Sequence, residues 1–435
     1  MLLSGGFAAL ALAGMAQGWA GCVLTARFAR ESRSVAASGP LRSGPVQGEE
    51  TGNGGPFPIT VLKPLHGDEP LLAKALTTLC EQDYPPGFQI VFGVGDARDT
   101  AIPVVHALQA RYPDLDIALM VEGARHGANP KVGNLINMLP AARHAIIVIA
   151  DSDVHAREDY LRALARTLER PGVGLATTLY TGLPAFAVPA GQLGATQITH
   201  IFLPGALLSR ALGRRDCLGA TMALRRDTLE RIGGLESLKD HLADDNVLGQ
   251  RVRAAGLDVA LAPTMVATTV PERGLAALWR HELRWARTIR ALEPAGFAAS
   301  LLQYPIFWAL LAIPASAGAS WAWGVFLFAW LSRALTATAI DRSVAPITPG
   351  LALRCPVWLL PARDVLSAVE WAASHAGRRV DWRGLTLEAD TPPPPAVSVT
   401  PSAIPPGGAT SAFSTAFSTT TSGTTSGTIK GSHAR

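Results

Sequence analysis

Charged residues are scarce in this chain of 435 residues: Asp, Glu, Lys and Arg make up 17% of it, whereas a typical soluble domain carries about 25%. Hydrophobic residues supply 48%, and the mean hydropathy is positive, at +0.23. This balance excludes an ordinary soluble enzyme and a wholly disordered chain. Long uncharged runs near both ends account for the deficit, so we expect a membrane protein with a soluble middle.

Lysine and cysteine are scarce as well. The net charge is only +4, and no basic stripe of the kind that binds nucleic acid is present, so we expect no nucleic-acid partner. The four cysteines are scattered and form no CxxC pair. Their spacing indicates neither a zinc site nor a disulfide framework.

The first uncharged run covers residues 2–26, which as a helix is long enough to cross a hydrocarbon core of about 30 Å. We therefore predict a transmembrane anchor over residues 1–26. A cleaved signal peptide is the alternative, but no Lys or Arg precedes the apolar run. Positive charge follows it, and the positive-inside rule then places the middle of the chain in the cytoplasm. The charges in question are Arg27, Arg30 and Arg33.

Two further apolar segments follow the middle of the chain. Over residues 297–340 the only charge is Arg333, and a break near Pro314 predicts a hairpin of two transmembrane helices. Residues 351–376 form a weaker third helix, in the membrane or in its interface. A buried core helix is the alternative for each run. Outside these segments, we expect a linker over residues 27–56 and a disordered tail, rich in Pro, Ser and Thr, over residues 391–435.

The middle of the chain, residues 57–295, alternates strand and helix patterns. Strands are expected at residues 58–65, 89–94, 116–121 and 145–150. Such alternation is typical of an α/β domain with a parallel sheet, which binds its ligands at the carboxyl ends of the strands. Polar residues lie at those ends.

Asp151 and Asp153 directly follow the fourth expected strand. Because residues i and i+2 of an extended segment point to the same side, both carboxylates can face one divalent cation, Mg or Mn, of the kind that bridges substrate phosphates. A DxD pair alone is weak evidence, since a solvated turn with Asp153 capping the next helix gives the same pattern.

Other positions support a nucleotide site. Asp96 and Asp99 follow the second strand, where they can hydrogen-bond a base and a ribose. Lys131 lies at an expected helix start, where a lysine and unpaired backbone amides suit a diphosphate. A loop of turn-forming acids and an exposed surface lysine are the plainer alternatives.

Two more features lie toward the end of this domain. Asp244 and Asp245 open an apolar helix, where two acids also serve as an N-cap pair. The sequence HELRW lies in an arginine-rich helix that leads to the membrane, and Arg280, Arg284 and Arg287 share one face of it. Binding of anionic lipid headgroups is the alternative for that helix.

In this order the motifs resemble the three-aspartate plus (Q/R)xxRW signature of membrane glycosyltransferases with the nucleotide-sugar-binding glycosyltransferase A fold. The chain is most similar to the ceramide glucosyltransferase family, glycosyltransferase family 21, and within it to bacterial relatives associated with hopanoid biosynthesis. The resemblance implies an α/β domain flanked by transmembrane helices. The stretches that carry it are VLKPLHGDEP, EQDYP, HGANPKVGNLINM, ADSDV, LGATMALRRDTL, DHLADDNVLG and HELRWARTIR.

The resemblance also implies a role for each motif position. Asp245 matches the catalytic base, and Asp151 with Asp153 matches the metal-binding pair. The box (Q/R)xxRW, which faces the acceptor or the diphosphate, matches His281, Arg284 and Trp285, so that His replaces Gln or Arg at its first position. The residues expected to bind the nucleotide-sugar are Asp96, Asp99, Lys131, Asp151, Arg284 and Trp285.

The implied reaction is a single inverting displacement, in which Asp245 takes the proton of a lipid hydroxyl as that oxygen attacks the anomeric carbon of a UDP-sugar. The implied donor is UDP-glucose or UDP-N-acetylglucosamine, and the acceptor is a hopanoid polyol or ceramide in the bacterial inner (cell) membrane. A processive polysaccharide synthase of the same superfamily is the alternative function, and a non-catalytic binding scaffold is a second one.

Overall fold

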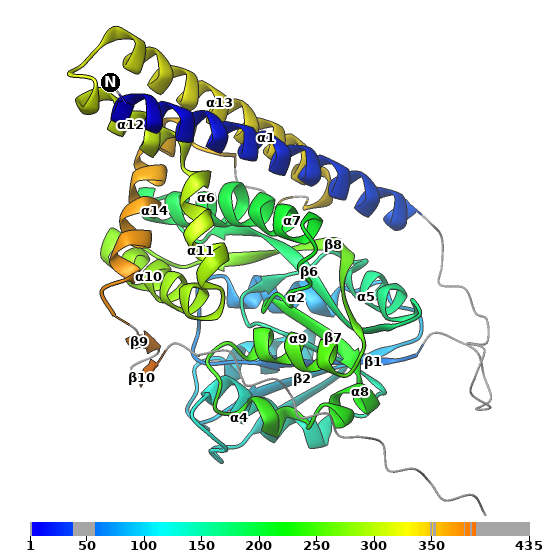
Figure 1. The fold of residues 1–435 in the computed structure, drawn as a ribbon. Helices are drawn as coiled ribbons and strands as arrows, with labels where there is room; N and C mark the ends of the chain where they lie inside the picture. The colour runs from blue at the N-terminus through cyan, green and yellow to red at the C-terminus, as the bar shows by residue number, and fades with distance from the viewer. Residues whose placement is uncertain are drawn as a thin grey trace, which may run out of the picture. The chain divides into compact units, whose positions relative to one another are not determined.

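The computed structural model describes residues 2–37, 57–348, 350, 354–377, 379–382 and 385–388. Within these residues, an eight-stranded sheet forms the centre of the domain, and apolar helices lie along one side of it (Figure 1). The expected tail over 391–435 lies outside the described residues, as does the part of the expected linker beyond residue 37.

The strands lie in the order β3-β2-β1-β4-β7-β6-β8-β5. The half of the sheet formed by the first four strands in the sequence is parallel, as their alternation with helices predicts. These strands are β1 (Ile59–Pro64), β2 (Phe88–Val94), β3 (Asp116–Val121) and β4 (Ile146–Ala150).

The other half departs from the parallel arrangement. β7 (Thr221–Arg225) is antiparallel to both of its neighbours, β4 and β6 (Val173–Pro184). At the far edge, β8 (Asp258–Val270) is parallel to β6 and antiparallel to the short β5 (Val154–His155). We predicted none of these strands from the sequence, so the parallel arrangement expected from the first four strands is confirmed for those four, and the sheet as a whole is mixed.

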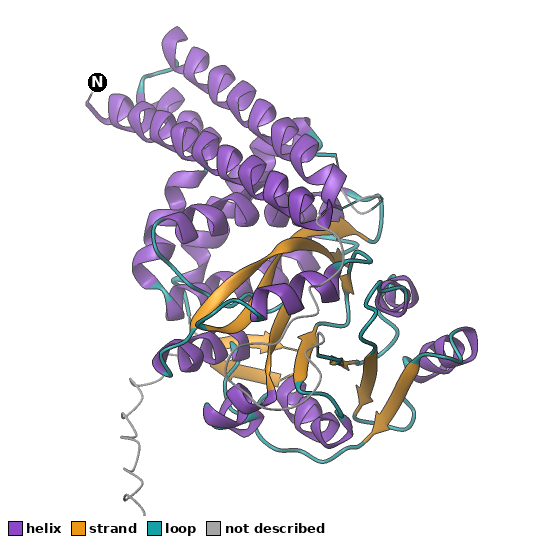
Figure 2. Ribbon diagram, turned by 90° about the vertical axis from the view of Figure 1, so that its right-hand side faces the viewer, coloured by secondary structure: helices purple, strands orange, loops and turns teal. Residues whose placement is uncertain are grey.

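Helices cover both faces of the sheet, as Figure 2 shows. One face packs against α2 (Leu72–Cys80), α3 (Ile102–Arg111) and α5 (Tyr160–Leu168). The opposite face packs against α4 (Pro130–Met138), α8 (Arg226–Arg231) and α9 (Asp244–Ala254). Consecutive residues of β1 enter the two different cores, Val61 the first and Leu62 the second, because side chains alternate along a strand.

The chain between β6 and β7 forms α6 (Pro189–Gln197), a π-helical segment (Ile198–Phe202) and α7 (Leu203–Ala211). After β8 comes α10 (Leu275–Leu292), which packs against α6 and α14. The remaining elements are α11 (Pro294–Ser300), α12 (Pro305–Ala315), α13 (Ser320–Val344), α14 (Leu360–Ser374) and the antiparallel pair β9 (Arg379–Trp382) and β10 (Leu385–Glu388).

The first helix, α1 (Leu2–Ala37), is longer than the expected anchor. It continues beyond residue 26, so the linker expected from residue 27 begins with helix. The physical reason is burial: Phe28 and Ala29 pack against Leu179 of β6 and Met265 of β8. The N-terminal half of α1 packs against α12 and α13 instead.

Two described helical segments are long and apolar enough to cross a membrane, Leu2–Val35 and Ser320–Ile347. The hairpin expected over residues 297–340 stays a prediction, since only its second helix meets these criteria by itself. Its second helix is α13, but α12 has 11 residues, or about 16 Å, and meets the preceding helical segment at a bend of 67°. That bent pair, Pro294–Gln303 with Pro305–Ala315, counts as a third span only if its two parts cross together.

The third expected helix, over residues 351–376, corresponds to α14. It is not among the described helices that meet the criteria for a span. Its charged side chains Arg363, Asp364 and Glu370 are buried, and the helix packs against α10 and α12. Contacts with protein, rather than lipid or interface, therefore surround these charges.

Candidate active site

Acidic residues from separate elements meet a lysine at the carboxyl end of β4. Lys131, in the first turn of α4, places Nζ 2.8 Å from Asp151 Oδ1 and 3.2 Å from Asp244 Oδ2. Asp151 directly follows β4, whereas Asp244 and Asp245 begin α9. Together with Asp153, these residues form the aspartate pocket.

The loops before α4 and α9 are tied to each other, which brings Lys131 to Asp244. The Asn129 side chain caps α4 by accepting from the backbone N–H groups of Lys131 and Val132. Its Nδ2 donates to the carbonyl of His241 at 2.7 Å. Gly127 is required for this approach, since a Cβ there would lie 2.6 Å from the carbonyl oxygen of Lys239.

Burial changes the titration of the pocket. It raises the pKa of Asp245 to about 7, with Asp244 as the next largest cause. Burial and the neighbouring Asp151 also raise the pKa of Asp153, to about 6. Burial alone would lower the pKa of Lys131, but Asp151 and Asp244 outweigh that effect and raise it. The lysine therefore stays charged, whereas Asp245 exchanges a proton near neutral pH.

Asp151 and Asp153 have different partners in the structure. Asp151 pairs with Lys131, but Asp153 accepts a short hydrogen bond from the Thr268 hydroxyl of β8. Between them, the Ser152 hydroxyl donates to Glu69 Oε2 at 2.6 Å.

Lys63, at the end of β1, lies under the same loop. It is fully buried and donates to the carbonyl of Val154 at 3.3 Å. Burial lowers its pKa to about 8, against the opposing effect of Asp153. We did not predict a role for Lys63 from the sequence, although a lysine at the end of an apolar strand was a visible signal.

The pocket suits a cation that is shared with a ligand. Among the described residues, no group of three or more His, Cys, Asp or Glu side chains is arranged to hold a metal ion. A cation that bridges phosphates needs only one or two carboxylates from the protein, because the phosphates and water complete its shell. Asp151 meets that need, since its side chain is 35% exposed and follows the DxD pattern with Asp153.

Asp96 and Asp99 have partners in the loops after β1 and β2. Asp96 is exposed and forms an ion pair of 2.9 Å with Arg98, and this hydrogen-bonded contact lowers the pKa of Asp96 to about 2. Asp99 Oδ1 accepts from the backbone N–H groups of Gly67 and Ala101, both at 2.9 Å. Asp99 thus joins the two loops, a structural role that we did not predict from the sequence.

The expected box lies on α10. The His281 ring contacts that of Trp285 edge-on, with centroids 4.6 Å apart. Trp285 packs against a cluster that includes Val270, as does Tyr180 of β6. Burial and then the charge of Asp245 raise the pKa of Tyr180, with smaller effects from Asp151 and Asp153. Tyr180 thus packs in the same cluster as Trp285 of the box, and its pKa responds to the charge of Asp245.

His281 also has a partner that we did not predict. Its Nδ1 lies 2.5 Å from Oε1 of Glu272, whose side chain is 7% exposed. Glu272 belongs to the segment between β8 and α10. No sequence motif includes Glu272, and a single acid in a short connecting segment is common.

A second group of buried charges joins α10, α13 and α14. Arg363 contacts Glu282 of α10 and Glu370, both at 2.9 Å. Arg333 of α13 contacts Asp364 at 3.1 Å. These five residues form the arginine cluster, and Glu282 directly follows His281 in the sequence.

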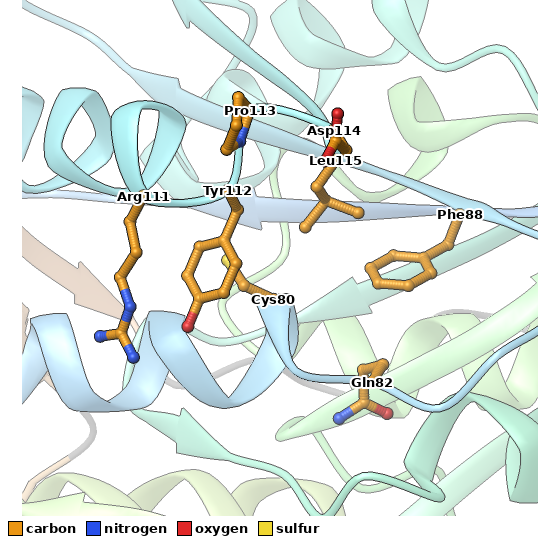
Figure 3. Close-up of a pocket in the computed structure, with 8 residues that line it drawn as sticks. All are labelled: Cys80, Gln82, Phe88, Arg111, Tyr112, Pro113, Asp114 and Leu115. Carbon is orange, nitrogen blue, oxygen red and sulfur yellow. The ribbon is translucent and has the colours of Figure 1, made fainter.

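A shallow hollow lies elsewhere, at the amino ends of β2 and β3 (Figure 3). Phe88 and Leu115 line it together with Tyr112 and Arg111. Because β2 and β3 are parallel to β1 and β4, their amino ends are at the edge opposite to the aspartate pocket. The hollow is therefore not part of the candidate active site.

A sequence model described as "Glycosyl transferase family 21" matches residues 34–392. Curated relatives include ceramide glucosyltransferase 1 of Caenorhabditis elegans, 23% identical over 54% of this chain and 50% of its own. Another is the beta-monoglucosyldiacylglycerol synthase of Trichormus variabilis, 24% identical over 53% of this chain and 48% of its own. The chain thus spans about half the length of these relatives.

Among solved structures, a mannosyltransferase from Pyrobaculum calidifontis in complex with GDP-Man and Mn2+ is similar. It is 21% identical, and the match covers 84% of this chain and 99% of that one with a TM-score of 0.43. A likeness at this level does not bear on the chemistry of the site.

Proposed function

The chain belongs to glycosyl transferase family 21, and we propose that it is an inverting enzyme that moves a sugar from a UDP-sugar to the hydroxyl of a membrane lipid. Relatives named ceramide glucosyltransferase and beta-monoglucosyldiacylglycerol synthase support a lipid acceptor. Two candidate spans support a place at the membrane. The acceptor is a hopanoid polyol or ceramide, and the donor is UDP-glucose or UDP-N-acetylglucosamine.

The observation that carries this proposal is the partly buried Asp245, which directly follows Asp244 in a cluster with Lys131 and Asp151. With a pKa raised to about 7, Asp245 can accept a proton from the acceptor hydroxyl at neutral pH. The hydroxyl oxygen then attacks the anomeric carbon, and UDP leaves from the opposite side. Inversion of an α-linked UDP-sugar gives a β-glycoside.

The leaving UDP gains negative charge, and cationic groups of the chain offset it. Lys131 is one such group, and Arg284 of the box is the other. A divalent cation held by Asp151 and Asp153 together with the diphosphate would supply further positive charge at the same place. Asp96 and Asp99 lie in or beside loops at the carboxyl ends of β1 and β2, where the base and ribose of the nucleotide bind.

In cells, we place the chain in the bacterial inner membrane with its catalytic domain in the cytoplasm. The arginines at 27, 30 and 33 that follow the first apolar run support this orientation. UDP-sugars are made in the cytoplasm, so the donor and the aspartate pocket are then on the same side.

The full chain in lipid nanodiscs tests the function directly. Nanodiscs that contain ceramide or a hopanoid polyol are incubated with each UDP-sugar, and the products are identified by mass spectrometry and their anomeric configuration by NMR. We expect one β-linked glycolipid, and less of it after chelation of divalent cations. A retained α-linkage would contradict inversion, a polymer would indicate a processive synthase, and UDP binding without any product would indicate a binding scaffold.

A further inference from the structure

Glu272 is held in a fixed position between β8 and α10. Before it, the carbonyl of Val270 accepts from the backbone N–H of Ala185 at 3.0 Å, and Pro271 restricts the backbone. After it, the Arg273 guanidinium lies over the Phe186 ring, 3.7 Å from its centroid. The Glu272 carboxylate is therefore presented to α10 by a segment that is anchored on both sides.

The contact with Glu272 determines which nitrogen of His281 remains for a ligand. A carboxylate only accepts hydrogen bonds, so Nδ1 carries the proton in the contact of 2.5 Å, and Nε2 is the nitrogen left over. The His281 side chain is 31% exposed, whereas that of Glu272 is 7% exposed. The Trp285 ring, one helical turn further on, packs edge-on against the imidazole and limits its rotation.

The three residues of the expected box lie on one face of α10, and one of them packs beside Tyr180. Arg284 and Trp285 follow His281 at helical spacings of three and four, so the three side chains share one face. Trp285 packs against the cluster that Tyr180 also contacts, and Tyr180 is near enough to Asp245 to feel its charge. His281 therefore shares a helix face with a side chain that packs beside Tyr180, whose pKa responds to the charge of Asp245.

From this geometry, we infer that Glu272 is a positioning residue that orients His281 so that Nε2 binds the diphosphate of the sugar donor. The inference rests on the proposed function. It explains the departure of this chain from (Q/R)xxRW. Gln and Arg both end in N–H donors, and His281, whose Nδ1–H is held by Glu272, becomes such a donor when Nε2 takes up a proton from solvent as the diphosphate binds. An unsupported imidazole would rotate, and Glu272 prevents that.

A double-mutant cycle separates this role from a structural one. We expect E272Q to weaken UDP binding to the full chain in nanodiscs about tenfold, the effect of a lost charge-assisted hydrogen bond. In the H281A background, E272Q should cause no further loss of UDP affinity, because the imidazole that Glu272 orients is absent. Calorimetry with UDP gives the affinities, and thermal unfolding reports whether each variant is folded.

E293Q is the matched control, since Glu293 follows α10 at its other end and pairs with Arg214. Its effect on UDP binding should be equal in both backgrounds. H281R, which restores a residue of the family signature, should bind UDP at least tenfold more tightly than H281A. An equal cost of E272Q in both backgrounds, or no gain from H281R over H281A, would overturn the inference.

The readout also distinguishes this inference from the proposed function. An intact cycle for UDP binding without glycolipid product would overturn the lipid glycosyltransferase assignment and leave the role of Glu272 standing. A glycolipid product without coupling between Glu272 and His281 would do the reverse. Failure of the unaltered chain to bind UDP would overturn both.

Discussion

The aspartate pocket and the arginine cluster both gather ionisable side chains, but they differ in burial and in charge balance. All five residues of the arginine cluster are buried, whereas Asp244 alone is buried in the aspartate pocket. In the arginine cluster, two arginines face three acids, and burial and then the charge of Glu282 raise the pKa of Glu370, which favours its neutral form. Arg333 and Arg363 then face the carboxylates of Asp364 and Glu282. In the aspartate pocket, Lys131 contacts Asp151 and Asp244, two of the four acids, and the side chain of Asp151 is partly exposed.

The difference separates two uses of buried charge. A buried ion pair that is closed and balanced costs desolvation but fixes the relative positions of the helices that carry it. A pocket with excess acid costs stability until a proton or a cation arrives. The first arrangement suits a scaffold, and the second suits a site that binds a cationic or proton-donating partner.

Removal of the proposed base should have the largest effect. D245N keeps the shape of the side chain but cannot accept a proton, so we expect kcat to fall about 100- to 10,000-fold. UDP affinity, measured by calorimetry on the full chain, should change little. Loss of UDP binding together with activity would instead place Asp245 among the donor-binding residues.

Removal of an arginine from the arginine cluster should lower the stability of the fold more than it lowers the catalytic rate. R363M leaves Glu282 buried without its cation, and we expect a loss of about 3 to 5 kcal/mol in the free energy of unfolding. Thermal unfolding in nanodiscs measures it. R98Q, which breaks the solvent-exposed pair with Asp96, is the control and should leave the unfolding temperature unchanged. Equal effects would mean that burial does not distinguish the two pairs.

A methyl group beside Asp245 should disturb the pocket without removing any charge. A Cβ at Gly219 would lie 2.8 Å from Asp245 Oδ2, so G219A must displace the carboxylate. We expect kcat to fall about 10- to 100-fold, as for other small misplacements of a catalytic group. G95A at the end of β2 is the matched control, because a Cβ there meets nothing within 4 Å. Unchanged kcat in G219A would show that Oδ2 is not the reacting oxygen.

The smallest effect concerns pH. Because the pKa of Asp245 is raised to about 7, activity should fall about tenfold per unit below pH 7, as the base becomes protonated. Stability should change in the opposite direction: the raised pKa favours the folded state at pH 4 and that advantage is lost as the pH rises through 7. D245N removes the group, so its unfolding temperature should exceed that of the unaltered chain at pH 8 but not at pH 4. A pH-independent difference would contradict the raised pKa.

Local sequence patterns were sufficient to predict where β1 to β4 lie, since strands buried on both faces are short apolar runs. They also placed Lys131 at the start of α4 and Asp244 with Asp245 at the start of α9. The contact between Lys131 and Asp244 could not be predicted. It depends on a pairing between the loops of Asn129 and His241, 112 residues apart, which no periodicity encodes.

The contact between His281 and Glu272 was also missed, although only nine residues separate them. Rules of helical spacing pair residues within α10, but Glu272 precedes the helix. The arginine cluster was hidden for a different reason. Arg363, Asp364 and Glu370 weakened the apolar pattern of residues 351–376, and only the fold shows that protein groups compensate their charges.

The length of α1 determines how the sheet is placed relative to the apolar helices. Its 36 residues extend about 54 Å as one continuous helix, well beyond a hydrocarbon core of about 30 Å. One half packs against α12 and α13, and the other packs against β6 and β8. The single helix therefore fixes the distance between the apolar helices and the sheet. The number of residues in α1 determines how far the sheet lies from the apolar helices along the helix axis. One inserted residue would add about 1.5 Å and turn one half by about 100° relative to the other.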